Sequence, residues 1–301
     1  MQAQAHIPVM LEESIRLLSP QPGCTYADAT LGLGGHTAAI LEASAPDGHV
    51  VALDRDLHAL EVARQRLQPF AGRVTMVEAE FANLRQVLNE LGIARVQGLI
   101  ADLGVSSLQL DTVERGFAFR HDAPLDMRMS PRQAQSAHDV LESVTEAELA
   151  DILWRYGEEN RSRAIARAIT RAKKHGRLAT TTDLASVVLS TIGRSVRSRV
   201  HPATRTFQAL RIYVNQELKQ LEQLLEQCPD ILNEGGVVVI LSFHSLEDRL
   251  VKRAFRNSEA WQVLTKKPLT ASETEVYANP RARSAKLRAA QRTSFSMEST
   301  L

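Results

Sequence analysis

The sequence has few cysteines, almost no net charge and no long hydrophobic run. Its 301 residues include only two cysteines, Cys24 and Cys228. These are far apart in the sequence and lack the spacing of a disulfide framework or a metal site. We therefore expect two reduced thiols and no bound metal. The formal net charge is +1, so the charge of the chain as a whole does not indicate a polyanionic partner.

The longest strongly apolar run is VVVIL at 237–241, far shorter than the roughly 20 residues that a transmembrane helix needs. The first residues, MQAQAHIPVMLEESIRLL, lack the basic and then apolar segments of a signal peptide. We expect a cytoplasmic protein. Apolar residues make up 44% of the chain, which is enough for a sizeable core in one large domain or two smaller ones.

Short apolar runs alternate with helical patterns over the first hundred residues. An amphipathic helix is expected over 57–67, with Leu57, Leu60, Ala63 and Leu67 on one face. The apolar runs predict strands at TYADA (25–29), HVVALD (49–54), RVTMVEA (73–79) and GLIADLG (98–104), with a later central strand in GGVVVILSFHS (235–245). This alternation predicts an α/β fold with a parallel, doubly wound sheet.

The alternation is interrupted in the middle of the chain. Residues 105–131 have a loop-like composition, and the helical patterns after them include no convincing strand. We expect an inserted all-helical domain at 111–205. The α/β domain is then discontinuous, formed by 1–110 and 206–301.

Two further patterns concern helices. Thr145 and Glu148 have the spacing of a capping box, which predicts a helix beginning there. Apolar residues recur every three or four positions from 204 to 228, which predicts one long helix with a buried face.

The segment DATLGLGGHT, which begins at Asp28, contains Gly32, Gly34 and Gly35. Glycines between a first strand and a helix are typical of nucleotide-binding α/β folds. The Lys and Ser/Thr of a phosphate-binding P-loop are absent, and Thr37 stands where a dinucleotide fingerprint has its third glycine. The Asp28 carboxylate would repel a pyrophosphate but suits an amine-bearing ligand such as S-adenosylmethionine. A plain turn and a dehydrogenase with a degenerate loop are the alternatives.

Acidic or polar residues follow several of the predicted strands. Asp28, Asp54 and Asp102 end three of them, and SFHS (242–245) ends a fourth. The carboxyl ends of parallel strands meet at one edge of a sheet, where ligands bind, so we expect these groups in one site. Asp54 is placed to accept hydrogen bonds from ribose hydroxyls; the alternative is a charge that stabilises the start of a helix.

Basic residues cluster in two places although the net charge is small. The span 155–205 has twelve Lys and Arg against three acids, and 281–292 has five basic residues and no acid. Both clusters indicate contact with RNA phosphates, with solvated helix faces as the alternative. Phe117 and Phe119 could stack on bases or pack beneath the insertion. A non-enzymatic RNA-binding protein therefore remains a second hypothesis.

Longer motifs carry a resemblance to a known family. The chain resembles, from residue 6 to residue 293, the RsmH (MraW) family of bacterial S-adenosylmethionine-dependent methyltransferases, which act on the N4 amine of a decoding-centre cytidine in small-subunit ribosomal RNA. The motifs are DATLGLGGHT, ALDRD, DLGVSS, ERGFAF, PLDMRM, HPATRTFQALRI and SFHSLEDR. The resemblance implies a class I (Rossmann-like) methyltransferase fold with a helical insertion. It also implies small-subunit RNA or the assembled 30S subunit as partner, and leaves a homodimer open.

The resemblance also implies a set of cofactor contacts. Gly34, Gly35 and His36 would line the methionine end and Asp54 would hold the ribose. Phe81, which composition alone would place in the core, would lie near the adenine. The residues that would complete the pocket are Asp102 and Gln109.

Methyl transfer to an amine needs an acceptor for the departing proton. The Pro-Pro segment of many amino-methyltransferases is absent after the fourth strand, so the candidates are Asp102, Ser242 and His244. His244 could orient the base or relay a proton; alternatively, it is a strand-end histidine bonded to the backbone. LEDR (246–249) is expected to begin a helix, with its acids in the first turn.

Overall fold

The computed structural model describes residues 8–193 and 201–293. The chain divides into two compact units, one formed by 1–104 with 218–301 and the other by 105–217. Each unit is built around its own hydrophobic core. The first unit is α/β, and the second has no named strand among its described residues.

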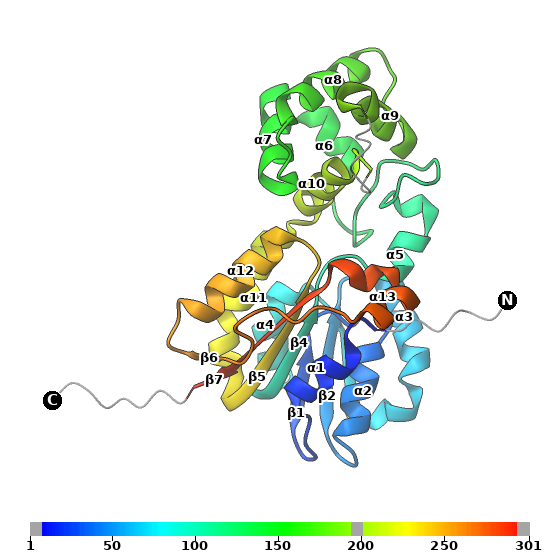
Figure 1. Ribbon diagram of the computed structural model, residues 1–301. Helices are drawn as coiled ribbons and strands as arrows, with labels where there is room; N and C mark the ends of the chain where they lie inside the picture. The colour runs from blue at the N-terminus through cyan, green and yellow to red at the C-terminus, as the bar shows by residue number, and fades with distance from the viewer. Residues whose placement is uncertain (1–7, 194–200, 294–301) are drawn as a thin grey trace. The chain divides into compact units, whose positions relative to one another are not determined.

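A seven-stranded sheet forms the centre of the first unit (Figure 1). Its order is β3-β2-β1-β4-β5-β7-β6. The first five strands in that order are parallel, and β7 runs antiparallel to both neighbours. The bounds are β1 Thr25–Asp28, β2 His49–Asp54, β3 Val74–Glu78, β4 Val96–Asp102, β5 Leu232–Ser242, β6 Trp261–Val263 and β7 Lys286–Arg292. The predicted α/β class is confirmed.

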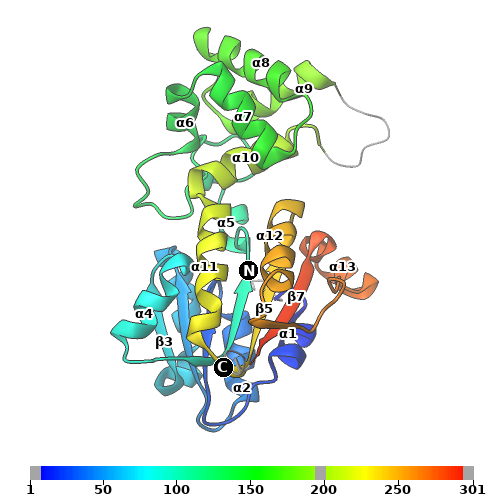
Figure 2. The same cartoon turned by 90° about the vertical axis from the view of Figure 1, so that its left-hand side faces the viewer.

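Helices cover both faces of this sheet (Figure 2). One face carries α1 (Leu11–Leu18), α2 (Gly35–Ala43), α3 (Leu57–Arg66) and the short α13 (Glu273–Ala278). The opposite face carries α4 (Leu84–Glu90), α11 (Glu217–Ile231) and α12 (Ser245–Arg256). Leu60, Ala63 and Leu67 are buried as predicted, but Leu57 is 42% exposed because it is the first residue of α3 and lies outside the packed turns.

Helices alone enclose the core of the second unit. They are α5 (Ser107–Asp111), α6 (Ala137–Ser143), α7 (Glu146–Gly157), α8 (Ser162–Lys174), α9 (Thr181–Ile192) and α10 (Thr204–Asn215). The capping box at the start of α7 is present as predicted, since Thr145 accepts from the Glu148 backbone and Glu148 accepts from the Thr145 backbone. Every helix among the described residues is too short or too polar to cross a membrane.

The single helix expected over 204–228 is wrong. Gln216 adopts a left-handed conformation with φ 51° and separates α10 from α11. Phe207, Leu210 and Val214 of α10 belong to the core of the helical unit. The division between the units therefore lies at 217/218 and not at the expected 205/206, because α10 packs on α7.

The C-terminal segment 281–292, expected as an RNA-contacting stretch, is largely a strand. Leu287, Ala289 and Ala290 of β7 are fully buried, and β7 pairs with β5 from Val237 to Ser242. Arg288 is 6% exposed and its Nε donates to Asp248 Oδ1 at 2.6 Å. The guanidinium of Arg288 is thus held in an ion pair with Asp248, whereas Arg281 and Arg283 are exposed, so RNA contact by this segment stays a prediction.

Candidate active site

The strand order reverses direction between β1 and β4, which are neighbours in the sheet. In doubly wound sheets this switch point, at the carboxyl ends of the strands, is where ligands bind. Asp28 ends β1 and Asp102 ends β4, and Asp54 ends β2 on the other side of β1. Three of the predicted acidic residues therefore meet at one edge.

Asp28 braces the glycine loop from within. It is 1% exposed, and its carboxylate accepts from the Thr37 hydroxyl at 2.6 Å and from the Thr30 N–H at 3.0 Å. Burial raises the pKa of Asp28, although the Thr37 hydrogen bond acts in the opposite direction. Thr37, at the position of the missing third glycine, is thus the partner that a buried Asp28 requires.

Backbone conformation and packing within the protein account in part for the glycines of this loop. Gly34 has φ 76°, a conformation that favours glycine, and a Cβ there would lie 3.2 Å from Leu67. A Cβ on Gly35 would lie 2.2 Å from Cγ of Pro8. Pro8 thus occupies the side of Gly35 where a Cβ would lie, and the expected contact of the Gly35 backbone with a cofactor stays a prediction.

Asp54 links the end of β2 to the glycine loop. Its carboxylate accepts from the Gly32 N–H and the Asp56 N–H, both at 2.8 Å. Asp56, and not Asp54, caps α3 by accepting from His58 N–H, so the helix-start alternative applies to Asp56. Burial raises the pKa of Asp54 to about 6. Each carboxylate oxygen has a second lone pair, so the group can still accept from ribose hydroxyls.

Buried His36 and partly exposed Asp102, whose side chain is 24% exposed, form an incompletely bonded pair. His36 Nε2 lies 3.7 Å from Asp102 Oδ2, and both ring nitrogens of His36 and Oδ1 of Asp102 lack a hydrogen-bond partner within the described chain. The Asp102 backbone N–H donates to the Thr30 hydroxyl at 2.6 Å, which fixes the end of β4 against the end of β1. Buried polar atoms without partners are rare, which makes His36 and Asp102 candidates for contact with a polar ligand.

Phe81 and Gln109 have structural contacts of their own. Phe81 is half-buried at the start of a 3₁₀ turn and packs against the core on the α4 and α11 face. Gln109 is buried in α5 of the helical unit, where its Oε1 accepts from the Ser106 N–H in a capping box. Their roles at a cofactor stay predictions from the family resemblance.

Ser242 and His244 end β5, beside β4. Ser242 is 1% exposed and its hydroxyl donates to the Lys286 carbonyl at 3.2 Å. His244 is the N-cap of α12, and its Nδ1 accepts from the Glu247 N–H at 3.4 Å. The backbone-bonded alternative for His244 is therefore present, and LEDR begins a helix as expected. A proton-accepting role for either residue stays a prediction.

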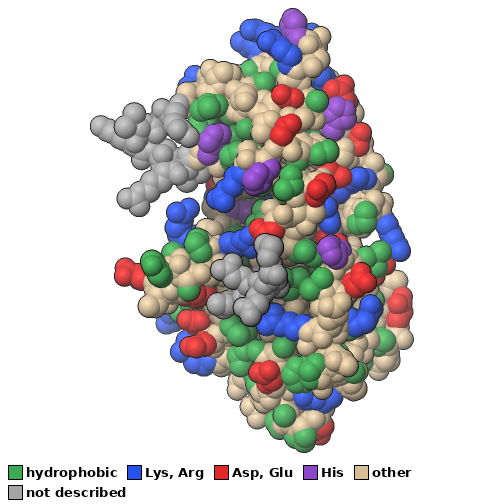
Figure 3. Space-filling model, turned by 90° about the vertical axis from the view of Figure 1, so that its right-hand side faces the viewer, with side chains coloured by type: hydrophobic (Ala, Val, Ile, Leu, Met, Phe, Trp, Pro, Cys, Tyr) green, Lys and Arg blue, Asp and Glu red, His purple; other side chains and the backbone are tan. Residues whose placement is uncertain are grey.

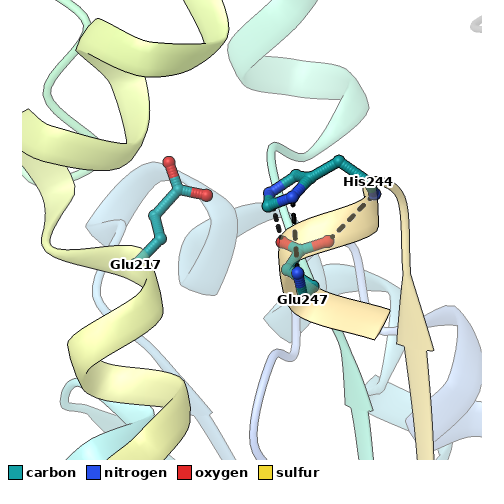
Figure 4. Close-up of side chains that lie close together, drawn as sticks. All are labelled: Glu217, His244 and Glu247. Atoms are coloured by element: carbon teal, nitrogen blue, oxygen red, sulfur yellow. Dashed lines mark hydrogen bonds and ion pairs between the residues drawn. The ribbon is translucent and has the colours of Figure 1, made fainter. Parts of the chain in front are cut away.

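Glu247 is not among the site residues expected from the sequence. Figure 4 shows its carboxylate turned towards the His244 ring, and Nε2 of His244 lies 3.1 Å from Glu247 Oε1. The same figure labels Glu217, whose carboxylate accepts two hydrogen bonds from Arg211 at 2.8 and 2.9 Å. A Glu three residues after a strand-end cap is the signal that would have found Glu247.

The basic span of the helical unit has a mainly exposed charged face. On α8, Ile165 and Ile169 are buried, while most of the Lys and Arg side chains face solvent, and Figure 3 shows Lys and Arg gathered at the end of this unit. Lys173 is an exception, because it donates to the Leu141 and Glu142 carbonyls. Three arginines of the predicted cluster, Arg194, Arg197 and Arg199, lie outside the described residues.

Phe117 and Phe119 pack within the helical unit. Phe117 is 8% exposed and belongs to its core. The ring of Phe119 lies 4.8 Å from that of Phe207 and 4.7 Å from that of His201. The packing alternative holds for Phe117. Cys24 and Cys228, as expected, are free thiols.

Comparison with known proteins assigns the chain to a family. Residues 3–293 match the model of the MraW methylase family. A protein of Sorangium cellulosum named ribosomal RNA small subunit methyltransferase H is 53% identical over 289 residues, which cover 96% of this chain and 91% of that protein. One of the same name from Acidobacterium capsulatum is 49% identical over 302 residues, covering 97% and 100%.

Among solved structures, an rRNA methylase from Streptococcus thermophilus has 12% identity and a TM-score of 0.43, with 94% of each chain covered. The assignment to a family rests on the sequence matches, because they cover nearly the whole length of this chain and of its relatives. The chain belongs to the MraW methylase family.

Proposed function

We propose that this chain transfers a methyl group from S-adenosylmethionine to the N4 amine of a cytidine in the decoding centre of small-subunit ribosomal RNA. Membership of a methylase family and the names of its relatives support the reaction class and the ribosomal substrate. The observation that supports the proposal in the structure is the His36–Asp102 pair, in which three side-chain polar atoms have no partner in the described chain, beside the switch point of the sheet.

The residues present fit S-adenosylmethionine. Its amino group and sulfonium are positive, and the Asp102 carboxylate, whose Oδ1 has no partner in the described chain, is an acceptor suited to a positive group. A neutral His36 adds one accepting and one donating ring nitrogen. Asp54 would accept from the ribose hydroxyls, and the half-buried ring of Phe81 would flank the adenine. The family resemblance implies three further cofactor contacts, which are Gln109, Gly34 and Gly35.

S-adenosylmethionine supplies an electrophilic methyl group. The cytosine N4 lone pair is delocalised into the ring, so the protein must hold the amine in line with that methyl group at about 3 Å. The amine then loses a proton. Asp102 and His244 are the proposed acceptors, and buried Ser242 would support the strand end between them.

The helical unit 105–217 is the proposed RNA-recognition domain. The exposed basic face of α8 supports this role, because phosphate contacts supply most of the non-specific affinity for RNA. The substrate is either the free RNA or the assembled 30S subunit.

The direct test is transfer of radiolabelled methyl from S-adenosylmethionine to small-subunit RNA, offered both free and in 30S subunits, followed by mass mapping of the product. Label in one cytidine as N4-methylcytidine is the expected result. Label at another base or in another RNA would contradict the specificity. Cofactor and RNA binding without transfer would favour the non-enzymatic alternative.

His244→Ala provides a second test. We expect this variant to lower methyl transfer on the order of a hundredfold, the typical contribution of a positioned acid or base. Calorimetry should show cofactor binding nearly unchanged. Equal turnover by the variant and the wild type on the ribosomal substrate would remove His244 from the mechanism.

A further inference from the structure

The loop between β5 and α12 holds an imidazole and a buried carboxylate together. Glu247 is 2% exposed, and its Oε2 accepts from the Phe243 N–H at 2.8 Å and from the His244 N–H at 3.3 Å. Its other oxygen, Oε1, lies 3.1 Å from His244 Nε2 (Figure 4). The His244 side chain itself is 8% exposed, so both groups have little access to water.

These contacts determine which ring nitrogen carries the proton. Nδ1 accepts from the Glu247 N–H, so it bears a lone pair and cannot bear a proton. In a neutral imidazole the proton is then on Nε2, and that nitrogen faces the Glu247 carboxylate at ion-pair distance without the alignment of a full hydrogen bond. The carboxylate therefore favours the tautomer in which Nδ1 is the acceptor.

This arrangement exceeds what a helix cap needs. Ser, Thr, Asp and Asn are the preferred N-caps, and histidine is not among them. The capping box of α7 uses Thr145 with Glu148, which is exposed to solvent. Burying a carboxylate is unfavourable unless the group is well paired, so a merely structural cap would not require a buried Glu beside a histidine.

We propose that Glu247 is a positioning residue that holds His244 in the tautomer able to take the proton of the amine. This inference rests on the proposed function. When the N4–C bond forms, the C–S bond breaks and its electron pair stays on sulfur as a neutral thioether. The methylated nitrogen then gives one proton to His244 Nδ1, which exchanges its long 3.4 Å contact with the Glu247 N–H for the substrate. The resulting imidazolium lies beside the Glu247 carboxylate and later releases the proton to solvent.

The register of the sheet places this pair at the correct edge. Leu241 of β5 is paired with Asp102 of β4, and His244 follows Leu241 by three residues. Neighbouring strands are about 4.8 Å apart. The pair therefore belongs to the same carboxyl edge as Asp102 and does not lie on a remote surface of the α/β unit.

Glu247→Gln tests the inference. Its amide oxygen can still accept the two backbone N–H groups, but its NH₂ would then face the Nε2–H and no longer favour that tautomer. We expect ¹⁵N NMR of the histidine-labelled protein without cofactor to show the Nε2–H tautomer of His244 in the wild type and a larger share of the Nδ1–H tautomer in the variant. We expect kcat to fall tenfold or more, on the order of a modest acid–base contribution, with KM for RNA and cofactor within about twofold.

Two control variants distinguish a positioning role of Glu247 from an effect on stability alone. Glu148→Gln makes the same change in the α7 capping box and should leave kcat unchanged. His244→Asn keeps a preferred N-cap but removes the imidazole. If Glu247 acts through His244, adding Glu247→Gln to His244→Asn should lower kcat no further, and this comparison still applies if Glu247→Gln alone folds poorly.

An Nδ1–H tautomer in the wild type would overturn the inference, as would a Glu247→Gln variant with wild-type kcat. An equal loss of kcat in Glu148→Gln would also overturn it. The proposed function fails separately, if the wild type transfers no methyl to small-subunit RNA, and the NMR measurement distinguishes the two cases because it needs neither substrate nor cofactor.

Discussion

Asp54 provides a prediction at the scale of a single residue. Its pKa is raised to about 6, chiefly by burial, while the hydrogen bonds from the Asp56 and Gly32 N–H groups oppose the shift. The carboxylate that would accept from ribose hydroxyls is therefore lost as the pH falls through 6. We expect calorimetry to show cofactor affinity constant above about pH 7 and up to about tenfold weaker near pH 5.

The Asp54→Asn variant is the matched comparison. Loss of a charged hydrogen-bond acceptor should weaken cofactor binding by about tenfold to a hundredfold at pH 7.5, and the variant should lose the pH dependence between 5 and 7. If that dependence persists, it belongs to Asp28, whose pKa burial also raises. Because the folded-state pKa of Asp54 exceeds its unfolded value, this group lowers the free energy of unfolding above pH 6.

Gly35 carries a second prediction at this scale. Since its Cβ would lie 2.2 Å from Pro8 Cγ, and Val9 and Met10 are buried after that proline, Gly35→Ala must displace a packed segment. We expect urea unfolding to show a loss of about 1–3 kcal/mol. Gly72→Ala, where a Cβ meets nothing within 4 Å, should be nearly neutral. Equal stability of the two variants would show that the Pro8 contact does not constrain the loop.

At the scale of the element, β7 is held to α12 by charge. Arg288 and Lys286 both contact Asp248, at 2.6 and 3.3 Å. Burial would raise the pKa of Asp248, but the hydrogen bond and charge of Arg288, followed by those of Lys286, outweigh it and lower the pKa. The stabilisation from this carboxylate is therefore present above about pH 4 and is lost as the pH falls further.

Arg288→Met should leave Asp248, whose side chain is only 14% exposed, without its main partner. We expect a loss of about 3 kcal/mol in the free energy of unfolding at pH 7, measured by urea titration, and a smaller difference from the wild type at pH 3. Arg283→Met, at an exposed position of the same tail, should change stability by less than about 0.5 kcal/mol. Similar losses in the two variants would contradict a specific role for the Asp248–Arg288 pair.

The same elements show how far the sequence predicts the fold. The strands at 25–29, 49–54, 73–79 and 98–104 were predictable because each is an apolar run between turn signals. The strand β7 was not, because KLRAAQR contains three basic residues and no run of large apolar ones. Its pairing with β5 also joins segments distant in the chain. Local pattern contains no information on such a pairing.

Part of the candidate site could likewise be predicted from the sequence, and part could not. The strand-end positions of Asp28, Asp54 and Asp102 follow from the alternation of strands and helices, so the sequence is enough to place them at one edge of the sheet. The buried state of Glu247 depends on how α12 packs, which no local pattern reports. The contact of Pro8 with Gly35 likewise depends on the path of the N-terminal segment.

At the scale of the whole molecule, the two units have separate cores. The helical core includes residues from Phe117 to Val214, and none of them belongs to either core of the α/β unit. Compact units with their own cores can in principle fold alone. The α/β unit is the harder one to isolate, because its sheet combines strands from both sides of the insertion.

The helical unit can therefore be tested as a separate polypeptide, and its boundaries decide the outcome. A fragment of 105–217 retains α10, whose Phe207, Leu210 and Val214 fill the core. A fragment of 111–205, the domain expected from sequence, lacks these side chains, and each large core residue removed costs about 2–5 kcal/mol. We expect circular dichroism to show cooperative thermal unfolding for the first fragment and not for the second. Cooperative unfolding of 111–205 would mean that α10 is not part of this core, because a domain of this size has only about 5–15 kcal/mol of stability to lose.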